Sequence, residues 1–327
     1  MPPQCRICQN VSGNRVFQAR EMMFGLRDAF DYFECAGCGC VQIADIPADM
    51  SRYYPANYYS FSAGKSKHGP LKRGIRRLKD SLRRRRYAHA GGRPSLLGRL
   101  LVSVQGAPRF PDWLGPAGVT ADDAILDVGC GAGELLYKMR DMGFRNLNGA
   151  DPFIAGEIDS GGVRIRKAFL KDLSGAYDLV MFHHSFEHVP DPEATLREAA
   201  RLTKPGKRVL IRVPLAGKFA WRKYGVDWVG LDAPRHFFLH TEASLKMLAD
   251  KAGLDLERIE YDSWSLQFWG SEQYRQDISL RSDRSWGTNP KQAPFTEAEV
   301  DEFKREATRL NEIGDGDQAC FYLRRRS

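Results

Sequence analysis

A turn with three alternating glycines is the first feature of this sequence that indicates a binding site. The apolar stretch AILDV leads into Gly129, Gly131 and Gly133, and Asp127 stands two positions before the first of them. A phosphate-binding loop would carry Lys and then Ser or Thr after its last glycine, whereas Glu134 follows here and would repel a phosphate. In a dinucleotide-binding turn the third glycine would come one position later. The turn therefore favours a ligand that carries positive charge and no pyrophosphate.

Four of the seven cysteines form two Cys-x2-Cys pairs, Cys5 with Cys8 and Cys35 with Cys38. Two such pairs allow four thiolates to converge on one Zn²⁺ ion in a tetrahedron, as in structural zinc ribbons. Four thiolates leave no coordination position for water, so we expect the zinc to be structural. The long gap between the pairs leaves room for a hairpin, and Cys40 is a spare thiol that could replace Cys38. Disulfides are the alternative, which the lack of a secretory signal in the first residues disfavours.

Beyond residue 121, apolar strands alternate with amphipathic helices. The predicted strands are 124–129, 147–151, 162–168, 177–184, 208–214, 254–261 and 317–325, and the predicted helices are 133–143, 191–207, 241–253 and 296–311. Thr241 and the Thr296-x-x-Glu299 capping box mark two helix starts. This alternation predicts an α/β fold with a doubly wound, mostly parallel seven-stranded sheet, whose ligands bind at the carboxyl ends of the strands. The predicted organisation is a ribbon module (1–62), a basic helical linker (63–120) and the α/β domain (121–327).

The stretch ILDVGCGAG, the acid Asp151 and the stretch YDLVMFHHSFEHVPDP resemble, in this order, the class I S-adenosylmethionine-dependent methyltransferases. The resemblance covers roughly residues 122–261 and the last strand. It implies that the glycines let the backbone approach the methionyl part of the cofactor, that Asp127 lies near its ammonium group and that Asp151 binds its ribose hydroxyls. A carboxylate about twenty residues beyond the glycines suits that role, since it can accept both hydroxyl protons. The cofactor-binding residues expected on this basis are Asp127, Gly129, Gly131, Gly133, Asp151, Phe169 and His183.

Methyl transfer is an in-line displacement at a sulfonium carbon, so the protein mainly aligns the acceptor with the methyl group. A hydroxyl acceptor is also helped by a general base, and histidine is the side chain best suited to this near neutral pH. The candidates that follow the fourth and fifth strands are His183, His184, Glu187, His188, Arg235, His236 and His240. We expect His184 and His236 to contact the acceptor, and the sequence does not say which of them is the base.

Residues 214–240 form the long connection after the fifth strand, where the relatives place an acceptor lid. Its aromatic residues would suit stacking on a sugar ring or another flat acceptor; they are Trp221, Tyr224, Trp228 and Phe237. Residues 265–316 form an insertion before the last strand, in place of the short hairpin that is usual there.

The formal net charge is +8, and one segment carries it. Residues 65–86 hold eleven Lys or Arg and one acid, which leaves the rest of the chain at −2. Leu71, Ile75, Leu78 and Leu82 recur at helical spacing, so the segment predicts a basic amphipathic helix. Such a helix can rest on an anionic membrane or a nucleic-acid backbone, or pack on its own domain. With no long apolar run and no secretory signal, the sequence predicts a cytoplasmic protein with peripheral contact at the inner membrane face.

The ribbon, the tyrosine-rich segment RYYPANYYSF and the α/β core together resemble bacterial methyltransferases that act on sugars of surface polysaccharides or natural products. The expected function is transfer of a methyl group from S-adenosylmethionine to a hydroxyl of a small-molecule or glycan acceptor. An RNA methyltransferase that grips phosphates with its ribbon and basic helix is one alternative. It is disfavoured because HHSF, rather than a base-handling motif such as Asn-Pro-Pro-Tyr, follows the fourth strand. An inactive scaffold with the methyltransferase fold is the other alternative, and the intact glycines and acids disfavour loss of cofactor binding.

Overall fold

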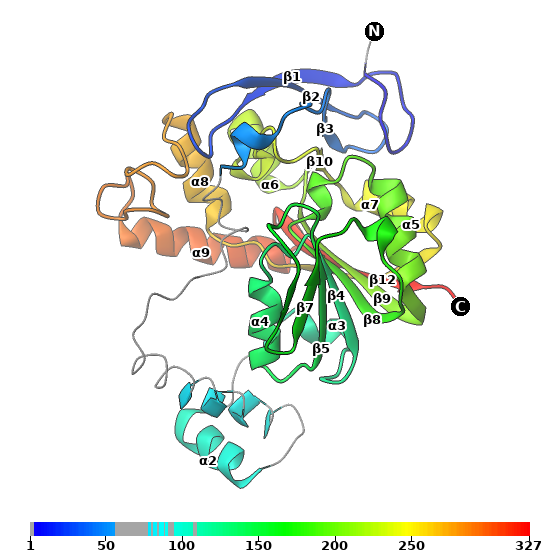
Figure 1. Cartoon of the computed structure of the whole chain (residues 1–327). Helices are drawn as coiled ribbons and strands as arrows, with labels where there is room; N and C mark the ends of the chain where they lie inside the picture. Colours follow the sequence, from blue (N-terminus) through cyan, green and yellow to red (C-terminus); the bar gives the residue numbers. More distant parts are fainter. Residues whose placement is uncertain are drawn as a thin grey trace. The chain divides into compact units, whose positions relative to one another are not determined.

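The fold is described from a computed structural model of the chain (Figure 1). The structure describes residues 3–55, 78–79, 81–83, 85–87, 89–90, 95–106 and 110–327. The chain divides into two compact units. Unit 1 comprises Met1–Pro55, His184–Arg197 and Ile211–Arg326, and unit 2 comprises Ala56–His183, Glu198–Leu210 and Ser327. Most of the predicted basic helix and part of the tyrosine-rich segment (Tyr58, Tyr59 and Phe61) lie outside the described residues.

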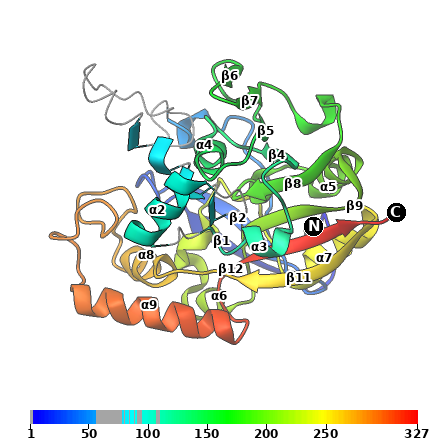
Figure 2. The same cartoon turned by 90° about the horizontal axis from the view of Figure 1, so that it is seen from below.

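Eight strands form the main sheet, in the order β11-β12-β9-β8-β4-β5-β7-β6. Their bounds are β4 (Ala124–Val128), β5 (Asn146–Ala150), β6 (Ile158–Ser160), β7 (Val163–Arg166), β8 (Tyr177–His183), β9 (Thr203–Pro214), β11 (Leu254–Tyr261) and β12 (Gln318–Arg325). The pairs β4–β5, β4–β8 and β5–β7 are parallel, whereas β11–β12 and β6–β7 are antiparallel. Figure 2 shows β11 and β12 next to β9. The predicted α/β fold with a mostly parallel sheet is confirmed; all seven predicted strands are present, and β6 is an additional short edge strand.

The middle strands are apolar on both faces, as expected where helices cover a parallel sheet on both sides. In β8, the side chains of Leu179, Val180, Met181 and Phe182 are all 0% exposed. This continuous apolar run fixes the strand in the core, so that the polar residues which follow it are held at the carboxyl end of the sheet.

The helices have the bounds α2 (Leu96–Gln105), α3 (Leu114–Ala117), α4 (Glu134–Asp141), α5 (Pro192–Leu202), α6 (Phe219–Tyr224), α7 (Glu242–Lys251), α8 (Leu266–Arg275) and α9 (Glu297–Glu312). The predicted helix starts are confirmed, because Thr241 accepts a hydrogen bond from the backbone N–H of Ser244 and Thr296 accepts one from that of Glu299. In the part of the chain that the structure describes, none of the helices combines the length and the apolar character needed to span a membrane.

One predicted helix boundary is wrong. The sequence pattern predicts a helix that continues to Pro205 and Gly206, but α5 ends at Leu202 and Thr203 already begins β9. Proline has no N–H to donate to the preceding turn, and it also disfavours helical backbone at the residue before it. The helix therefore ends earlier, and the Pro-Gly pair lies in the first part of the strand.

A second sheet has the order β1-β2-β3-β10 and lies within unit 1. Its strands are β1 (Arg15–Arg20), β2 (Ala29–Glu34), β3 (Val41–Ile43) and β10 (Phe238–Leu239). The β1–β2 hairpin occupies the gap between the two cysteine pairs, where the sequence left room for one. β10 comes from the predicted lid and pairs antiparallel with β3, with Phe238 opposite Gln42. The end of the lid is therefore a strand of the ribbon sheet.

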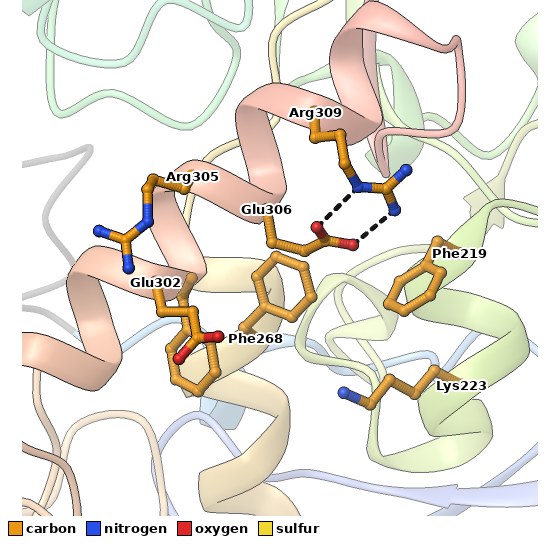
Figure 3. Close-up of a pocket in the computed structure, with 8 residues that line it drawn as sticks. Phe219, Lys223, Phe268, Glu302, Arg305, Glu306 and Arg309 are labelled. Atoms are coloured by element: carbon orange, nitrogen blue, oxygen red, sulfur yellow. Dashed lines mark hydrogen bonds and ion pairs between the residues drawn. The ribbon is translucent and has the colours of Figure 1, made fainter.

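The predicted insertion 265–316 contains α8 and α9, which pack through aromatic rings. Phe268 stacks on Phe303 with ring centroids 5.4 Å apart. A pocket of about 420 Å³ lies beside these rings. Figure 3 shows side chains that line it, among them Phe219 and the charged residues Lys223, Glu302, Arg305, Glu306 and Arg309. Phe219 and Lys223 belong to the predicted lid, but the pocket shares no residue with the predicted cofactor-binding residues and contains neither His184 nor His236.

Candidate active site and metal-binding residues

The glycine turn between β4 and α4 has a backbone that only glycine adopts readily. Gly129, Gly131 and Gly133 have φ angles of +73°, +53° and +82°. A Cβ atom on Gly133 would lie 2.4 Å from Cδ1 of the buried Ile165. The N–H of Gly129 donates to the carbonyl oxygen of Ala150, which ties the turn to β5. The turn is thus fixed, and side chains are absent where a ligand can approach the backbone.

Two buried carboxyl groups flank this turn, because β4 and β5 are parallel neighbours and end at the same edge of the sheet. Asp127 is 3% exposed and Asp151 is 6% exposed. Asp151 accepts hydrogen bonds from the N–H of Gly131 at 2.9 Å and from the N–H of Phe153 at 2.8 Å. Burial raises the pKa of Asp127 to about 8, and the nearby charge of Asp151 adds to the rise. A cation bound here would favour the ionised form of Asp127.

Two exposed phenylalanines lie near this edge of unit 2. Phe153 is 73% exposed and Phe169 is 54% exposed, and their ring centroids are 6.5 Å apart in an edge-on arrangement. Phe169 is among the residues predicted from the sequence, whereas Phe153 was missed. Its position two residues after Asp151 was the available signal. His183, also predicted, packs against Trp113 with ring centroids 4.4 Å apart.

In unit 1, three histidines surround the carboxylate of Glu187. Nδ1 of His184 lies 3.6 Å from Oε1 of Glu187, and Nε2 of His236 lies 3.9 Å from the same atom. Glu187, His188 and His236 each place one potential ligand atom within 4.8 Å of the others. Burial alone would raise the pKa of Glu187, but the three histidines outweigh it and lower this pKa to about 2. The structure thus brings the two predicted acceptor-contacting histidines, His184 and His236, to one ionised carboxylate.

His184 has an unusual backbone conformation and a cationic neighbour. Its φ angle is +52°, in the left-handed region that side chains other than glycine rarely adopt. Nη1 of Arg212 lies 2.7 Å from Nε2 of His184, and Nε of Arg212 donates to Asp262. The guanidinium can only donate, so Nε2 of His184 accepts and its proton is on Nδ1, towards Glu187.

Arg235 and His240, two other candidates from the sequence, are buried and contact other parts of unit 1. Arg235 is 0% exposed and donates from Nη2 to Glu21 at 2.9 Å and to Asp232 at 2.6 Å. This buried network links the ribbon module to the lid within unit 1. His240 is fully buried beside two phenylalanine rings, and burial lowers its pKa to about 4.

The aromatic residues of the lid are buried. Their exposed fractions are 5% for Trp221, 4% for Tyr224, 0% for Trp228 and 7% for Phe237. Trp228 also donates from its indole nitrogen to Asp317 at 2.8 Å. The interpretation that these rings stack on the acceptor is therefore wrong, because they form part of the core of unit 1, where large aromatic side chains gain most from burial.

The four paired cysteines converge as the sequence predicts. Sγ of Cys5 lies 3.6 Å from Sγ of Cys38, and Sγ of Cys8 lies 3.4 Å from Sγ of Cys35. Sulfur atoms bound to one zinc at about 2.3 Å are about 3.8 Å apart in a tetrahedron, so this group fits a zinc ion. The seven cysteines are all free thiols, which contradicts the disulfide alternative. Cys40 points elsewhere, since its thiol donates to the carbonyl oxygen of Val41.

Known methyltransferases are similar to this chain in sequence. A family described as a methyltransferase domain matches residues 82–259, more than half of the chain. The ubiquinone biosynthesis O-methyltransferase of Xanthomonas oryzae pv. oryzae is 31% identical over 162 residues, which cover 43% of this chain and 67% of that protein. The protein of the same name from Xanthomonas axonopodis pv. citri is 31% identical over 173 residues, 46% of this chain and 70% of that protein. Among solved structures, the cyclopropane synthase MmaA2 from Mycobacterium tuberculosis matches with a TM-score of 0.41 and 17% identity, over 65% of this chain and 81% of that one.

The chain belongs to the methyltransferase-domain family. It is an enzyme that uses S-adenosylmethionine as methyl donor, which makes the inactive-scaffold alternative the weaker one.

Proposed function

We propose that this enzyme transfers the methyl group of S-adenosylmethionine to a hydroxyl of a small-molecule or glycan acceptor in bacterial polysaccharide or natural-product biosynthesis. The glycine turn between the buried Asp127 and Asp151 is the observation that carries this proposal. The two curated relatives are named O-methyltransferases, which supports an oxygen acceptor. The choice of a sugar rests on the resemblance of the ribbon and core together to sugar methyltransferases.

The cofactor-binding roles follow from the chemistry of each group. The bare backbone at Gly129, Gly131 and Gly133 would border the methionyl part, with Asp127 on its ammonium group. Each carboxylate oxygen of Asp151 accepts one hydrogen bond from the backbone, so each keeps a lone pair for a ribose hydroxyl. The exposed rings of Phe153 and Phe169 would contact the adenine, and His183 would border the same ligand.

We propose His236 as the general base and His184 as a residue that contacts the acceptor without taking its proton. Nδ1 of His236 lies 2.8 Å from the carbonyl oxygen of Gly230, so this nitrogen carries the proton and Nε2 keeps its lone pair. In His184 the corresponding nitrogen already accepts from Arg212. We therefore expect His236→Gln to lower kcat by about a hundredfold or more, and His184→Gln to act mainly on KM.

We also propose that Cys5, Cys8, Cys35 and Cys38 bind one structural Zn²⁺ ion. The observed sulfur separations support this, as do N–H groups directed at the sulfurs, such as Nε2 of Gln42 at 3.0 Å from Sγ of Cys5. We also propose the domain boundaries 1–62 for the ribbon module, 63–120 for the linker and 121–327 for the α/β domain.

A peripheral membrane contact is proposed for the segment that contains residues 65–86 and α2, in a cytoplasmic protein. Leu96, Leu100 and Val104 recur on one face of α2 and are 89%, 57% and 75% exposed. Such an apolar face next to basic residues suits anionic lipid. Sedimentation with phosphatidylglycerol vesicles tests it, and equal binding of wild-type and Leu100→Ser protein would contradict it.

The acceptor is tested by incubating the enzyme with S-adenosylmethionine and a panel of nucleotide-sugars, glycans and phenolic compounds. The expected result is release of S-adenosylhomocysteine together with a mass gain of one CH2 unit on a hydroxyl compound. Methylation of RNA instead would overturn the acceptor class. Failure of S-adenosylmethionine to bind in calorimetry would overturn the cofactor site itself.

A further inference from the structure

The carboxylate of Glu187 is fully buried. The side chain is 0% exposed, and neither of its oxygen atoms has a hydrogen-bond partner among the residues that the structure describes. A buried carboxylate in this state is unfavourable unless a positive group approaches it. The groups that face it within 4 Å are imidazole nitrogens, Nδ1 of His184 and Nε2 of His236. A cation that uses nitrogen and oxygen ligands together would satisfy this arrangement.

Backbone carbonyls hold the rings of two histidines that lie close to this carboxylate. Nδ1 of His188 lies 2.7 Å from the carbonyl oxygen of Arg235, and Nδ1 of His236 lies 2.8 Å from that of Gly230. A histidine whose Nδ1–H donates to a carbonyl presents the lone pair of Nε2, which is the state of metal-binding histidines in proteins. Both rings are thus held in the tautomer that coordinates a metal.

We propose that Glu187, His188 and His236 bind one divalent transition-metal ion. Two imidazoles and one carboxylate favour Zn²⁺, Fe²⁺, Co²⁺ or Mn²⁺, since Mg²⁺ and Ca²⁺ prefer oxygen ligands alone. Three protein ligands leave coordination positions open to a further molecule. Ligand atoms about 2.1 Å from one ion are about 3.0 to 3.5 Å apart. Nε2 of His236 and Oε1 of Glu187 are 3.9 Å apart and need to close by about 0.4 to 0.9 Å. The three candidate ligand atoms lie within 4.8 Å of one another, so no pair needs to close by more than about 1.8 Å.

Asp232 supports this site from outside. Its Oδ2 lies 3.8 Å from Nε2 of His236, but the same oxygen accepts a hydrogen bond from Nε of Arg235, and Oδ1 accepts one from Nη2. The carboxylate is therefore already engaged by the buried guanidinium. Its charge favours a cation at the imidazole pair without making Asp232 a ligand.

This inference deepens the proposed function. The role of the ion rests on that function, because the ion would lie where we propose that the acceptor hydroxyl loses its proton. With the ion bound, Nε2 of His236 would be a ligand rather than the base. The ion would take over that role, because a divalent ion lowers the pKa of a hydroxyl bound to it. Metal binding needs neither cofactor nor acceptor. It can therefore fail while methyl transfer succeeds, or succeed while the acceptor class is wrong.

The test is a Co²⁺ titration of the full chain. The protein is first loaded with one equivalent of Zn²⁺, which fills the cysteine site. Bound cobalt is measured by equilibrium dialysis, and absorption spectra show whether thiolates ligate it. We expect one bound Co²⁺ per chain with no thiolate charge-transfer band. Glu187→Gln, His188→Gln and His236→Gln should each weaken its binding by tenfold or more. His89→Gln, which removes a histidine of unit 2, is the matched control and should bind Co²⁺ as the wild type does.

Retained zinc and an unchanged melting temperature show that each variant is folded. If Glu187→Gln does not fold, the variants of the less buried His188 and His236 still test the proposal. Wild-type protein that binds no cobalt beyond the cysteine site would overturn the proposal. So would three folded variants that bind Co²⁺ as tightly as the wild type does.

Discussion

Asp151 accepts a hydrogen bond from the backbone N–H of Gly131, with Oδ2 at 2.9 Å from the nitrogen. The residue assigned to the ribose therefore also holds the glycine turn in place. Its second oxygen holds the start of the following loop through the N–H of Phe153. The proposed ribose contact and the conformation of the turn therefore involve the same side chain.

Replacement of Asp151 tests this double role. We expect Asp151→Ala to lower the affinity for S-adenosylmethionine by more than tenfold, which corresponds to about 1.4 kcal/mol. It should also lower the free energy of unfolding by about 1–3 kcal/mol, because two N–H groups lose their acceptor. Calorimetric titration and chemical denaturation measure the two effects. Affinity within about twofold of the wild type would show that Asp151 does not bind the cofactor.

Gly133 and Gly162 allow backbone strain to be separated from steric overlap. Both have φ +82°, but a Cβ atom on Gly133 would lie 2.4 Å from Cδ1 of Ile165. A Cβ atom on Gly162 would have no described residue's atom within 4 Å. Gly162→Ala should destabilise by about 1 kcal/mol through strain alone. Gly133→Ala should destabilise by a further 1–3 kcal/mol or so and weaken cofactor binding. Equal losses in the two variants would mean that Ile165 moves aside freely.

Cofactor binding should depend on pH through Asp127. Its pKa is raised to about 8 by burial and then by Asp151, so the ligand-free protein holds a proton there at neutral pH. A ligand ammonium favours the carboxylate, and binding therefore releases this proton. Affinity should rise by up to tenfold per pH unit between about pH 6 and 7.5, below the range in which an α-amino group itself titrates. Calorimetry in two buffers of different ionisation enthalpy counts the released proton, and Asp127→Asn should bind weakly with no such slope.

The raised pKa of Asp127 also affects the stability of the ligand-free protein. Its contribution to the free energy of unfolding decreases with rising pH, whereas that of most paired carboxylates increases. A carboxyl whose folded pKa is raised binds more protons in the folded state, so stability falls as pH rises from about 4 to 8. The Asp127→Asn variant should therefore be more stable than the wild type at pH 8 without ligand. Thermal unfolding at pH 5 and pH 8 measures the difference. A variant less stable at both pH values would contradict the assigned charge state.

The sequence was sufficient for the features that depend on local pattern. The apolar run of β8 and the caps at Thr241 and Thr296 are written in residues close to one another, and the structure agrees with them. The Cys-x2-Cys pairs similarly define their own geometry. These patterns involve residues close together in the sequence, so they can be recognised without knowledge of the tertiary structure.

The features that the sequence did not reveal depend on contacts between distant residues. Pairing of Phe238 with Gln42 joins two segments almost two hundred positions apart, and no local pattern specifies it. Glu187 follows a strand among polar residues, where an acid is usually solvated, yet it is fully buried. Trp228 is buried for a related reason, since its hydrogen-bond partner Asp317 lies 89 positions further along the chain.

Asp178 should contribute to stability at neutral pH but not in acid. It is 8% exposed and binds Nζ of Lys204 at 2.7 Å and Nζ of Lys207 at 3.1 Å. Burial would raise the pKa of Asp178, but Lys204, the N–H of Ala124 and Lys207 outweigh it and lower this pKa to about 2. Because the folded pKa is depressed, the contribution is present above about pH 4 and is lost as pH falls towards 2.

We expect Asp178→Asn to reduce the free energy of unfolding at pH 7 by about 1–2 kcal/mol, a range that allows for screening around the two half-exposed lysines. The difference from the wild type should shrink as the pH is lowered to about 3. Urea denaturation across this range measures it. A constant difference would show that shape, rather than charge, is responsible.

Removal of zinc from the ribbon should also affect the lid. The hydroxyl of Thr241, the residue that follows the lid, donates to the carbonyl oxygen of Cys38 at 2.6 Å, so loss of the metal should loosen both segments. Cys38→Ser should lose the zinc and lower the melting temperature, whereas Cys40→Ser should keep one zinc per chain, because the thiol of Cys40 donates to the carbonyl oxygen of Val41 instead. Metal analysis and thermal unfolding, with and without chelator, measure these outcomes. Zinc retained by Cys38→Ser but lost by Cys40→Ser would assign the fourth ligand to Cys40, and protein that never contains zinc would remove the metal from the ribbon.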